Sequence, residues 1–340
     1  MTFQKRMFRF GTTASCAVLL GALVACGSSE TATTGQEDPV ASGADSGSSL
    51  EGDILIDGSS TVFPISEAMA EEFGAENPGV NVTVNLSGSG GGFKKFCAGE
   101  TDISNASRPI KDEEVALCED AGIEFIEVPV AYDGLTIVVN PENDWAQCLT
   151  TDQLNAMWSP DAETNGVDSW AEADPSFPDE PLALYGPGAD SGTFDYFTDE
   201  VNGDEGVSRG DYQASEDDNL IVNGVQGEKG GLGYFGYAYF EENSDALKAV
   251  EIQNEAGDCV APSRETIADG SYNPMSRPLF FYVRADAYET KPQVKAYVDY
   301  KVDPANSALI GDVGYVPLPA DDIAASQARL SEKKTGKDPQ

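Results

Sequence analysis

The chain has 340 residues, 40% of them apolar and 9% aromatic, enough for one large domain or two of ordinary size. Its 59 acidic and 20 basic residues give a formal net charge of −39, which argues against nucleic acid and anionic lipid surfaces as partners. It contains no histidine, which excludes Ser-His-Asp and Cys-His catalysis, imidazole metal sites and a histidine general base. Most enzyme classes are thereby disfavoured.

The first 26 residues have the pattern of a secretory signal. A basic start is followed by an apolar run over 14–25 that is too short for a transmembrane helix. The run ends in Leu-Val-Ala-Cys, which resembles a bacterial lipobox whose cysteine carries lipid. We therefore expect a lipoprotein signal peptide at 1–25 and lipidation of Cys26. An ordinary signal peptide with a coincidental cysteine is the alternative.

Residues 26–52 are rich in Gly, Ser, Thr and Ala, carry acidic side chains and lack aromatic ones. Such a segment buries too little apolar surface to offset its ordering entropy, so we expect it to be disordered. About 24 flexible residues would reach on the order of 25–30 Å. This length suits an acidic tether between the lipid and the folded body.

The folded body is predicted to alternate between strands and helices. Strands are predicted at 54–56, 80–86, 101–106, 125–130, 135–139, 182–185 and 279–283. Helices are predicted after DGSSTVFP, from Phe93, and at 112–121, 193–201 and 291–300, with a short one near 151–157 in a loop-rich stretch. In the first helix Ile65, Met69 and Phe73 recur at helical spacing. This order is typical of an α/β protein with a mainly parallel sheet.

Four cysteines remain after the signal and the lipidated residue, namely Cys97, Cys118, Cys148 and Cys259. An even number in an exported protein indicates disulfides, with three possible pairings. We favour Cys97–Cys118 with Cys148–Cys259, because the first two end helical stretches that flank one predicted strand. No C-x-x-C spacing and no histidine supports a zinc site, and we expect neither a metal nor a cofactor.

Three predicted strands end in a Gly/Ser/Thr loop that opens a helix. The loops are Gly58-Ser59-Ser60-Thr61, Ser87-Gly88-Ser89-Gly90 and Asp190-Ser191-Gly192-Thr193. Each offers backbone N–H groups, the positive end of a helix dipole and hydroxyl donors. A single loop of this kind is better explained as a helix cap. Loops at the carboxyl ends of strands in an α/β sheet gather on one side, however, so three of them with Arg108 predict an oxyanion site.

The segments DGSSTVFP, SGSGGGFKKFCAGETDIS, ASRPI and YGPGADSGTFDYF follow one another in this order. Together they resemble the phosphate-binding lipoproteins of bacterial Pst-type ABC transporters, the PstS family, from about Asp53 to Pro317. The resemblance implies a two-lobed periplasmic-binding-protein fold of the α/β class, type II-like, with hinge strands between the lobes. It implies that lobe 1 comprises 53–133 plus 275–340, and that lobe 2 comprises 134–274.

The resemblance also implies which residues bind phosphate. The first loop contributes Ser60, Thr61 and Val62, and the second contributes Ser89. The third loop contributes Ser191, Gly192 and Thr193. Ser107, Arg108 and Asp190 complete the expected set.

Two positions depart from the family. Pro187 stands where well-studied members keep an arginine, and Ser107 stands where many keep an aspartate. Arg108 is expected to supply the guanidinium that is missing at Pro187 and to donate hydrogen bonds to two phosphate oxygens at once. The alternative is that Arg108 is a surface arginine before a proline turn. Asp190, Asp133 or a serine oxygen is a candidate acceptor for the phosphate proton, which sulfate lacks. Asp190 is equally well explained as a helix N-cap.

Arg277 precedes a predicted strand, where we expect it only to pack or form a pair. The implied function is capture of inorganic phosphate outside the cytoplasm and its delivery, without chemistry, to a membrane ABC permease and its ATPase. We expect a monomer that binds no nucleic acid and contacts the membrane only through its N-terminal lipid. The alternatives are a binder of sulfate or molybdate, a phosphatase, and a structural surface lipoprotein. A phosphatase would need carboxylate and histidine clusters that hold metals.

Overall fold

The structure is a computed structural model that describes residues 50–189 and 191–337. The predicted signal peptide, Cys26, most of the tether and Asp190 lie outside the described residues, so the predictions made for them stay predictions. Within the described part, no helix combines the length and the hydropathy that crossing a membrane requires.

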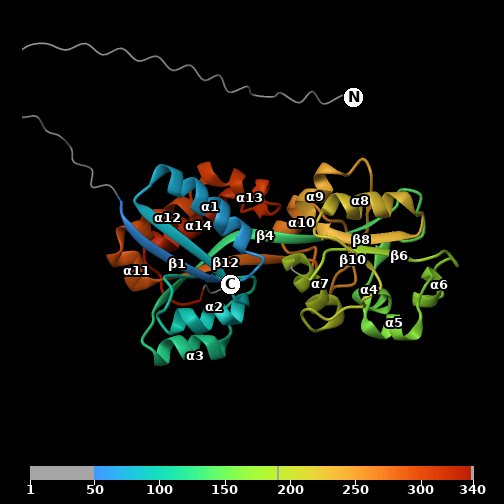
Figure 1. Cartoon of the computed structure of the whole chain (residues 1–340), viewed down its shortest axis with the longest axis horizontal. Helices are drawn as coiled ribbons and strands as arrows, with labels where there is room; N and C mark the ends of the chain where they lie inside the picture. Colours follow the sequence, from blue (N-terminus) through green and yellow to red (C-terminus); the bar gives the residue numbers. More distant parts are fainter. Residues whose placement is uncertain (1–49, 190, 338–340) are drawn as a thin grey trace, which may run out of the picture. The chain divides into compact units, whose positions relative to one another are not determined.

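The main sheet is organised around β4 (Phe125–Val139), a strand of 15 residues. Up to Gly134 it pairs with β12 (Ser276–Arg284), and from Leu135 onward it pairs with β8 (Gly231–Gly236). Figure 1 shows β4 continuing from the β12 side to the β8 side. We predicted two separate strands here. They are one strand because the intervening residues, from Ala131 to Gly134, also pair with β12.

The remaining strands extend the sheet on both sides of β4. Beyond β12 lie β3 (Ile103–Ala106), β1 (Gly52–Gly58) and β2 (Val80–Leu86), and beyond β8 lie β6 (Ala183–Gly186) and β7 (Gln213–Ala214). The short strands β9 (Lys248–Ala249) and β13 (Val316–Pro317) also pair with β4. A separate sheet has the order β11 (Cys259–Val260), β10 (Glu251–Gln253) and β5 (Cys148–Leu149).

The sheet is mixed rather than mainly parallel. β1 runs parallel to β2 and β3, and β6 runs parallel to β7 and β8, as expected where a helix crosses between neighbouring strands. The long strands β4 and β12 instead run antiparallel to each other and to their other partners. The α/β class is confirmed, but the direction of pairing follows from the chain connections, which hydrophobic periodicity does not report.

The predicted helices form in the predicted order, together with further helices that the sequence pattern did not predict. The first part of the chain contains α1 (Phe63–Glu76), α2 (Gly88–Cys97) and α3 (Asp112–Asp120). The middle contains α4 (Thr151–Trp158), α5 (Pro160–Asn165), α6 (Trp170–Ala173), α7 (Gly192–Asn202), α8 (Asp218–Gly227), α9 (Tyr237–Glu242) and α10 (Arg264–Ala268). The last part contains α11 (Ala285–Thr290), α12 (Pro292–Lys301), a 3₁₀ turn (Pro304–Asn306), α13 (Ala308–Asp312) and α14 (Ala320–Ser331).

Helix α2 begins at Gly88, five residues before the predicted start at Phe93. Glycine disfavours a helix interior, which is why the sequence pattern there indicates a loop. A close approach requires one of these glycines, because a Cβ on Gly92 would lie 2.6 Å from the Cα of Gly58. Helix α2 can therefore pack tightly on the end of β1.

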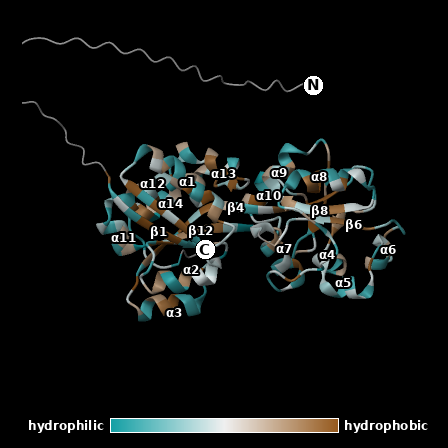
Figure 2. Ribbon diagram, in the orientation of Figure 1, coloured by the Kyte–Doolittle hydropathy of each residue, from teal (hydrophilic) through white to brown (hydrophobic). Residues whose placement is uncertain are grey.

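Two large hydrophobic clusters divide along β4. The first packs α1 and α12 against β1, β3, β12 and the first part of β4, with Phe73, Val128 and Phe281 among its members. The second packs α4 and α7 against β8 and the last part of β4, with Trp158 and Tyr234 among its members. In Figure 2 the strands β1, β12, β4 and β8 contain many hydrophobic residues and lie between helices with hydrophilic stretches. Each half of β4 is thus covered by its own helices.

The cysteine pairs are the two that we favoured. Cys97 at the end of α2 is bonded to Cys118 in α3, and Cys148 in β5 is bonded to Cys259 in β11. Glu251 lies beside the second pair. Because these two sulfur atoms are bonded to each other, the group is not a metal site.

Candidate functional site

A cavity of about 720 Å³ lies between the loops that follow β1 and β3, the start of α2, helix α7 and the start of β12. Its hydroxyl-bearing residues are Ser59, Ser60, Thr61, Ser87, Ser89 and Ser107. Its basic residues are Arg108, Lys111 and Arg277, and its acidic residues are Asp195, Asp199, Glu200 and Glu205. Five of the predicted ligand residues therefore share one cavity, namely Ser60, Thr61, Ser89, Ser107 and Arg108.

Backbone contacts hold the loops after β1 and β3 together. Gly58 has φ +143°, and a Cβ there would collide with the carbonyl oxygen of Asn105. The Ser59 N–H donates to that same carbonyl at 3.0 Å. The Ser107 N–H donates to the Ser89 hydroxyl at 3.1 Å, and the two serine hydroxyls lie 3.2 Å apart. The three loops from this part of the chain are thereby fixed relative to one another.

The third predicted loop lies against Thr61, which lines the cavity. A Cβ on Gly192 would lie 2.8 Å from the Thr61 hydroxyl, so only glycine lets α7 approach this closely. The Ser191 hydroxyl accepts the Thr193 N–H and caps α7. Among the described residues, Ser191, Gly192, Thr193 and Val62 are not part of the cavity lining. Their role in binding stays a prediction.

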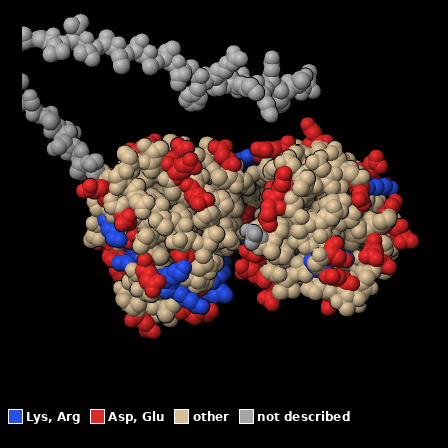
Figure 3. All heavy atoms as spheres, viewed as in Figure 1, with Lys and Arg blue, Asp and Glu red and all other residues tan. Residues whose placement is uncertain are grey.

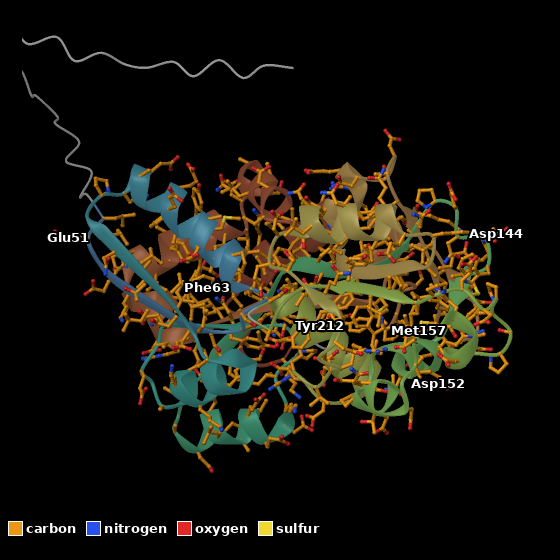
Figure 4. The ribbon with its side chains drawn as sticks, turned by 45° about the vertical axis from the view of Figure 1, so that its right-hand side comes forward. Glu51, Phe63, Asp144, Asp152, Met157 and Tyr212 are labelled. Carbon is orange, nitrogen blue, oxygen red and sulfur yellow. A yellow bond between two sulfur atoms is a disulfide. The ribbon has the colours of Figure 1, made fainter. Side chains whose placement is uncertain are left out.

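Pro187, at the position where well-studied family members keep an arginine, lies in the loop after β6. Its carbonyl accepts the Tyr212 hydroxyl at 2.7 Å. Figure 4 labels Tyr212 and also Phe63, the first residue of α1. The third loop therefore offers no guanidinium at this position, and the cationic groups of the cavity come from other elements.

Arg108 lines the cavity, but both of its terminal nitrogens donate to Glu114 at 2.8 Å. The hydrogen bond with Glu114 raises the pKa of Arg108. Burial opposes ionisation of Glu114, but Arg108 and the Lys111 N–H outweigh burial and lower the pKa of that carboxyl. In this structure the guanidinium fork expected for a ligand is occupied by a carboxylate of α3.

Arg277 is a cavity residue whose role the sequence did not indicate. Its Nε donates to the Asp133 carboxylate at 3.2 Å and its Nη2 donates to the Thr61 hydroxyl at 3.1 Å. Its guanidinium carbon lies 3.6 Å from the centroid of the Tyr196 ring, and 18% of its side chain is exposed. Arg277 and Asp133 are cross-strand partners in the β12–β4 pairing, a relation that only the fold creates.

Asp133 is buried behind Arg277. Burial raises the pKa of its carboxyl, and Arg277 opposes that rise by its charge and its hydrogen bond. Asp133 is not among the residues that line the cavity, so within the described part it contacts the site through Arg277. The ion pair with Asp133 and the hydrogen bond to Thr61 hold the Arg277 guanidinium at the cavity, which both Arg277 and Thr61 line.

Four carboxylates line the cavity on its α7 side. The Ser60 hydroxyl donates to Asp195 at 3.3 Å. Burial raises the pKa values of the Asp195, Glu200 and Glu205 carboxyls above their ordinary values. The charge of Arg277 offsets only part of that rise. Figure 3 shows basic atoms gathered over α2 and α3 and acidic atoms over α7. A ligand in this cavity would meet both donors and proton acceptors, which suits an anion that carries a proton.

Residues 28–305 match the model of the PBP superfamily domain. Protein SphX of Synechococcus elongatus is 48% identical over 283 residues, covering 83% of this chain and 82% of that protein. The phosphate-binding protein PstS of Staphylococcus saprophyticus is 39% identical over 331 residues, covering 97% of this chain and 95% of that protein.

Two solved structures extend the comparison. A possible phosphate binding protein from Planctomyces limnophilus is 46% identical, with a TM-score of 0.80 over 84% of this chain and 100% of that one. A putative phosphate ABC transporter substrate-binding protein from Clostridium perfringens, solved with bound phosphate, is 26% identical, with a TM-score of 0.52 over 79% of this chain and 100% of that one.

Proposed function

Because the chain belongs to the PBP superfamily and to the family of the phosphate-binding proteins PstS, we propose that it captures inorganic phosphate in the cavity described above. One observation carries this proposal: Ser60, Thr61, Ser89, Ser107 and Arg108, predicted from separate loops, line the same cavity. Arg277 contributes a further guanidinium beside Thr61. Hydroxyl and guanidinium donors are the groups that bind a tetrahedral oxyanion. Val62, Asp190, Ser191, Gly192 and Thr193 complete the proposed ligand set.

The proposed lobes are 53–133 plus 275–340 and 134–274. Two observations support this division: β4 exchanges β12 for β8 between Gly134 and Leu135, and the two largest hydrophobic clusters separate along the same strand. In this interpretation β4 and β12 are the strands that connect the lobes. Closure of the lobes over phosphate would exclude water and strengthen every hydrogen bond to the anion.

The protein is proposed to act outside the cytoplasm, anchored through Cys26, and to deliver phosphate to an ABC permease and its ATPase as a monomer. The putative transporter substrate-binding protein of known structure supports this role by its similarity. Delivery requires no bond to be made or broken, so we propose that the chain is not an enzyme. Release follows when docking favours the open form of the protein.

Calorimetric titration of the purified protein with phosphate, sulfate and molybdate tests the proposed function. We expect one phosphate per chain and an affinity for phosphate at least about tenfold higher than for sulfate, because a proton on phosphate can be accepted by a carboxylate of the site. We also expect no hydrolysis of p-nitrophenyl phosphate. Tighter binding of sulfate or molybdate would assign the other oxyanion, and hydrolysis would indicate a phosphatase.

We propose Asp195 as the carboxylate that accepts the phosphate proton, since it lines the cavity and is held by the Ser60 hydroxyl. The substitution Asp195→Asn is expected to weaken phosphate binding about tenfold and to strengthen sulfate binding, because the charge that repels sulfate is removed. Asp199→Asn is the matched control, since Asp199 lines the cavity without that hydrogen bond. Unchanged sulfate affinity in Asp195→Asn would assign the acceptor elsewhere.

A further inference from the structure

Lys301, the last residue of α12, is a buried cation outside the cavity, with 3% of its surface exposed. Its ammonium donates to the Ser66 hydroxyl at 2.9 Å and lies 4.8 Å from the ring centroid of Phe281 and 5.6 Å from that of Tyr297. Across 50–189 and 191–337, no carboxylate forms an ion pair with it. A buried charge without a counter-ion is strongly unfavourable, so its presence requires an explanation other than stability.

A series of hydrogen bonds leads from Lys301 toward the cavity. The Ser66 hydroxyl, in α1, donates to the Asn105 side-chain oxygen at 3.2 Å, and all three of these residues are buried. The Asn105 carbonyl accepts the Ser59 N–H, and Asn105 stands two residues before Ser107. The ammonium is therefore joined, through two side chains, to both the loop after β1 and the loop after β3.

We propose that Lys301 is a positioning residue of the phosphate site, which holds these two loops through Ser66 and Asn105 and places a buried positive charge behind them. The inference rests on the proposed function. A phosphate anion in the cavity is the negative charge that the surroundings of Lys301 otherwise lack. Attraction between the two is weakly screened in the protein interior, so it acts without direct contact.

The protonation of Lys301 is expected to depend on pH near neutrality, because burial lowers its pKa to about 7. The side chains that face its ammonium come from α1, β12 and α12, and of these only Tyr297 is titratable; burial raises the pKa of Tyr297, so it stays neutral. In the small cavity beside the Lys301 stem, Asp303 is the titratable neighbour among the described residues. The part of the phosphate affinity due to the charge of Lys301 is therefore present below about pH 7 and lost as the pH rises above it.

The same group makes a separate prediction about stability. The ordinary pKa of lysine, 10.5, applies to the unfolded chain, whereas the folded value is about 7. Between these pH values the folded protein binds fewer protons than the unfolded chain, so the wild type loses stability as the pH falls from about 10.5 to about 7. Methionine at this position carries no charge, and the variant is therefore expected to be more stable than the wild type at pH 7.

Phosphate affinity and thermal unfolding of Lys301→Met, compared with the wild type, test the inference. We expect binding to weaken about three- to tenfold at pH 6 and by a smaller factor at pH 9, where the wild-type amine is neutral but still donates to Ser66, while the unfolding midpoint at pH 7 rises by about 5 °C. Affinity and stability thus change in opposite directions, which a merely structural lysine would not produce. Lys295→Met, on the same helix but with an exposed ion pair to Asp299, is the control that should change neither.

The outcomes separate this inference from the proposed function. A wild type that does not bind phosphate contradicts the proposed function itself. A wild type that binds phosphate, with Lys301→Met binding equally well at pH 6, overturns the role of Lys301 and leaves the function intact. A variant that loses affinity and stability together also overturns it. Should Lys301→Met not fold, Ser66→Ala breaks the same series of hydrogen bonds and is expected to weaken phosphate about threefold; unchanged affinity would refute the positioning role.

Discussion

Phosphate binding is expected to weaken by at least about a hundredfold when Arg277 is replaced by methionine. A charge-assisted hydrogen bond contributes about 1.5–3 kcal/mol, and a hundredfold loss corresponds to about 2.7 kcal/mol. The substitution has a second effect, because Asp133 then stays buried without its partner next to the anion site. Methionine keeps the length of the stem but donates no hydrogen bond to Thr61. Isothermal titration calorimetry with phosphate measures the loss.

Two further variants test whether that loss of affinity is specific to the guanidinium of Arg277. Arg108→Met removes the other cavity arginine, whose two terminal nitrogens already donate to Glu114, and is therefore expected to cost less affinity than Arg277→Met. Arg277→Lys keeps the charge beside Asp133 and is expected to retain the fold while binding phosphate about tenfold less tightly, since an ammonium lacks the planar fork. Binding by a folded Arg277→Met variant within about threefold of wild type would show that Arg277 only packs and pairs.

Removing the Cys148–Cys259 disulfide is expected to lower the free energy of unfolding by about 5 kcal/mol, whereas removing Cys97–Cys118 should cost about 3 kcal/mol. The difference follows from the length of chain that each disulfide closes into a loop. Cys148 and Cys259 are separated by 111 residues, whereas Cys97 and Cys118 are separated by 21. The longer pair also spans a sheet whose strands β5, β10 and β11 are only two or three residues long. Double Cys→Ser variants unfolded in urea provide the measurement.

Phosphate affinity serves as the control for the disulfide variants. None of the four cysteines lines the cavity, so each folded variant should bind phosphate as the wild type does at low denaturant. A larger loss of stability from the Cys97–Cys118 variant than from the Cys148–Cys259 variant would contradict the loop-length argument. Such a result would show that the contribution of a disulfide to stability depends mainly on native-state contacts between α2 and α3 and not on the length of the closed loop.

The sequence was most informative where the signal is local. Helices α3, α7 and α12 begin and end within one residue of their predicted bounds, and β2 matches at both ends, because each is specified by the spacing of apolar residues within itself. The Gly/Ser/Thr loops were recognisable for the same reason. Three of the predicted cavity hydroxyls, those of Ser60, Thr61 and Ser89, belong to these loops, and Ser107 and Arg108 follow the next strand. Composition alone, through the absence of histidine, had already disfavoured most catalysis.

The sequence by itself determined the short-range elements and the donor loops, and it favoured the observed cysteine pairs among three possible pairings. The sequence also placed Arg108 beside these loops, but only the tertiary structure added Arg277 to the cavity and buried Lys301 behind it. Arg277 meets Asp133 across two strands that are 144 residues apart, and Lys301 meets Ser66 across 235 residues. Such pairings depend on strand register and helix packing, which long-range contacts establish and which no spacing along a single chain reports.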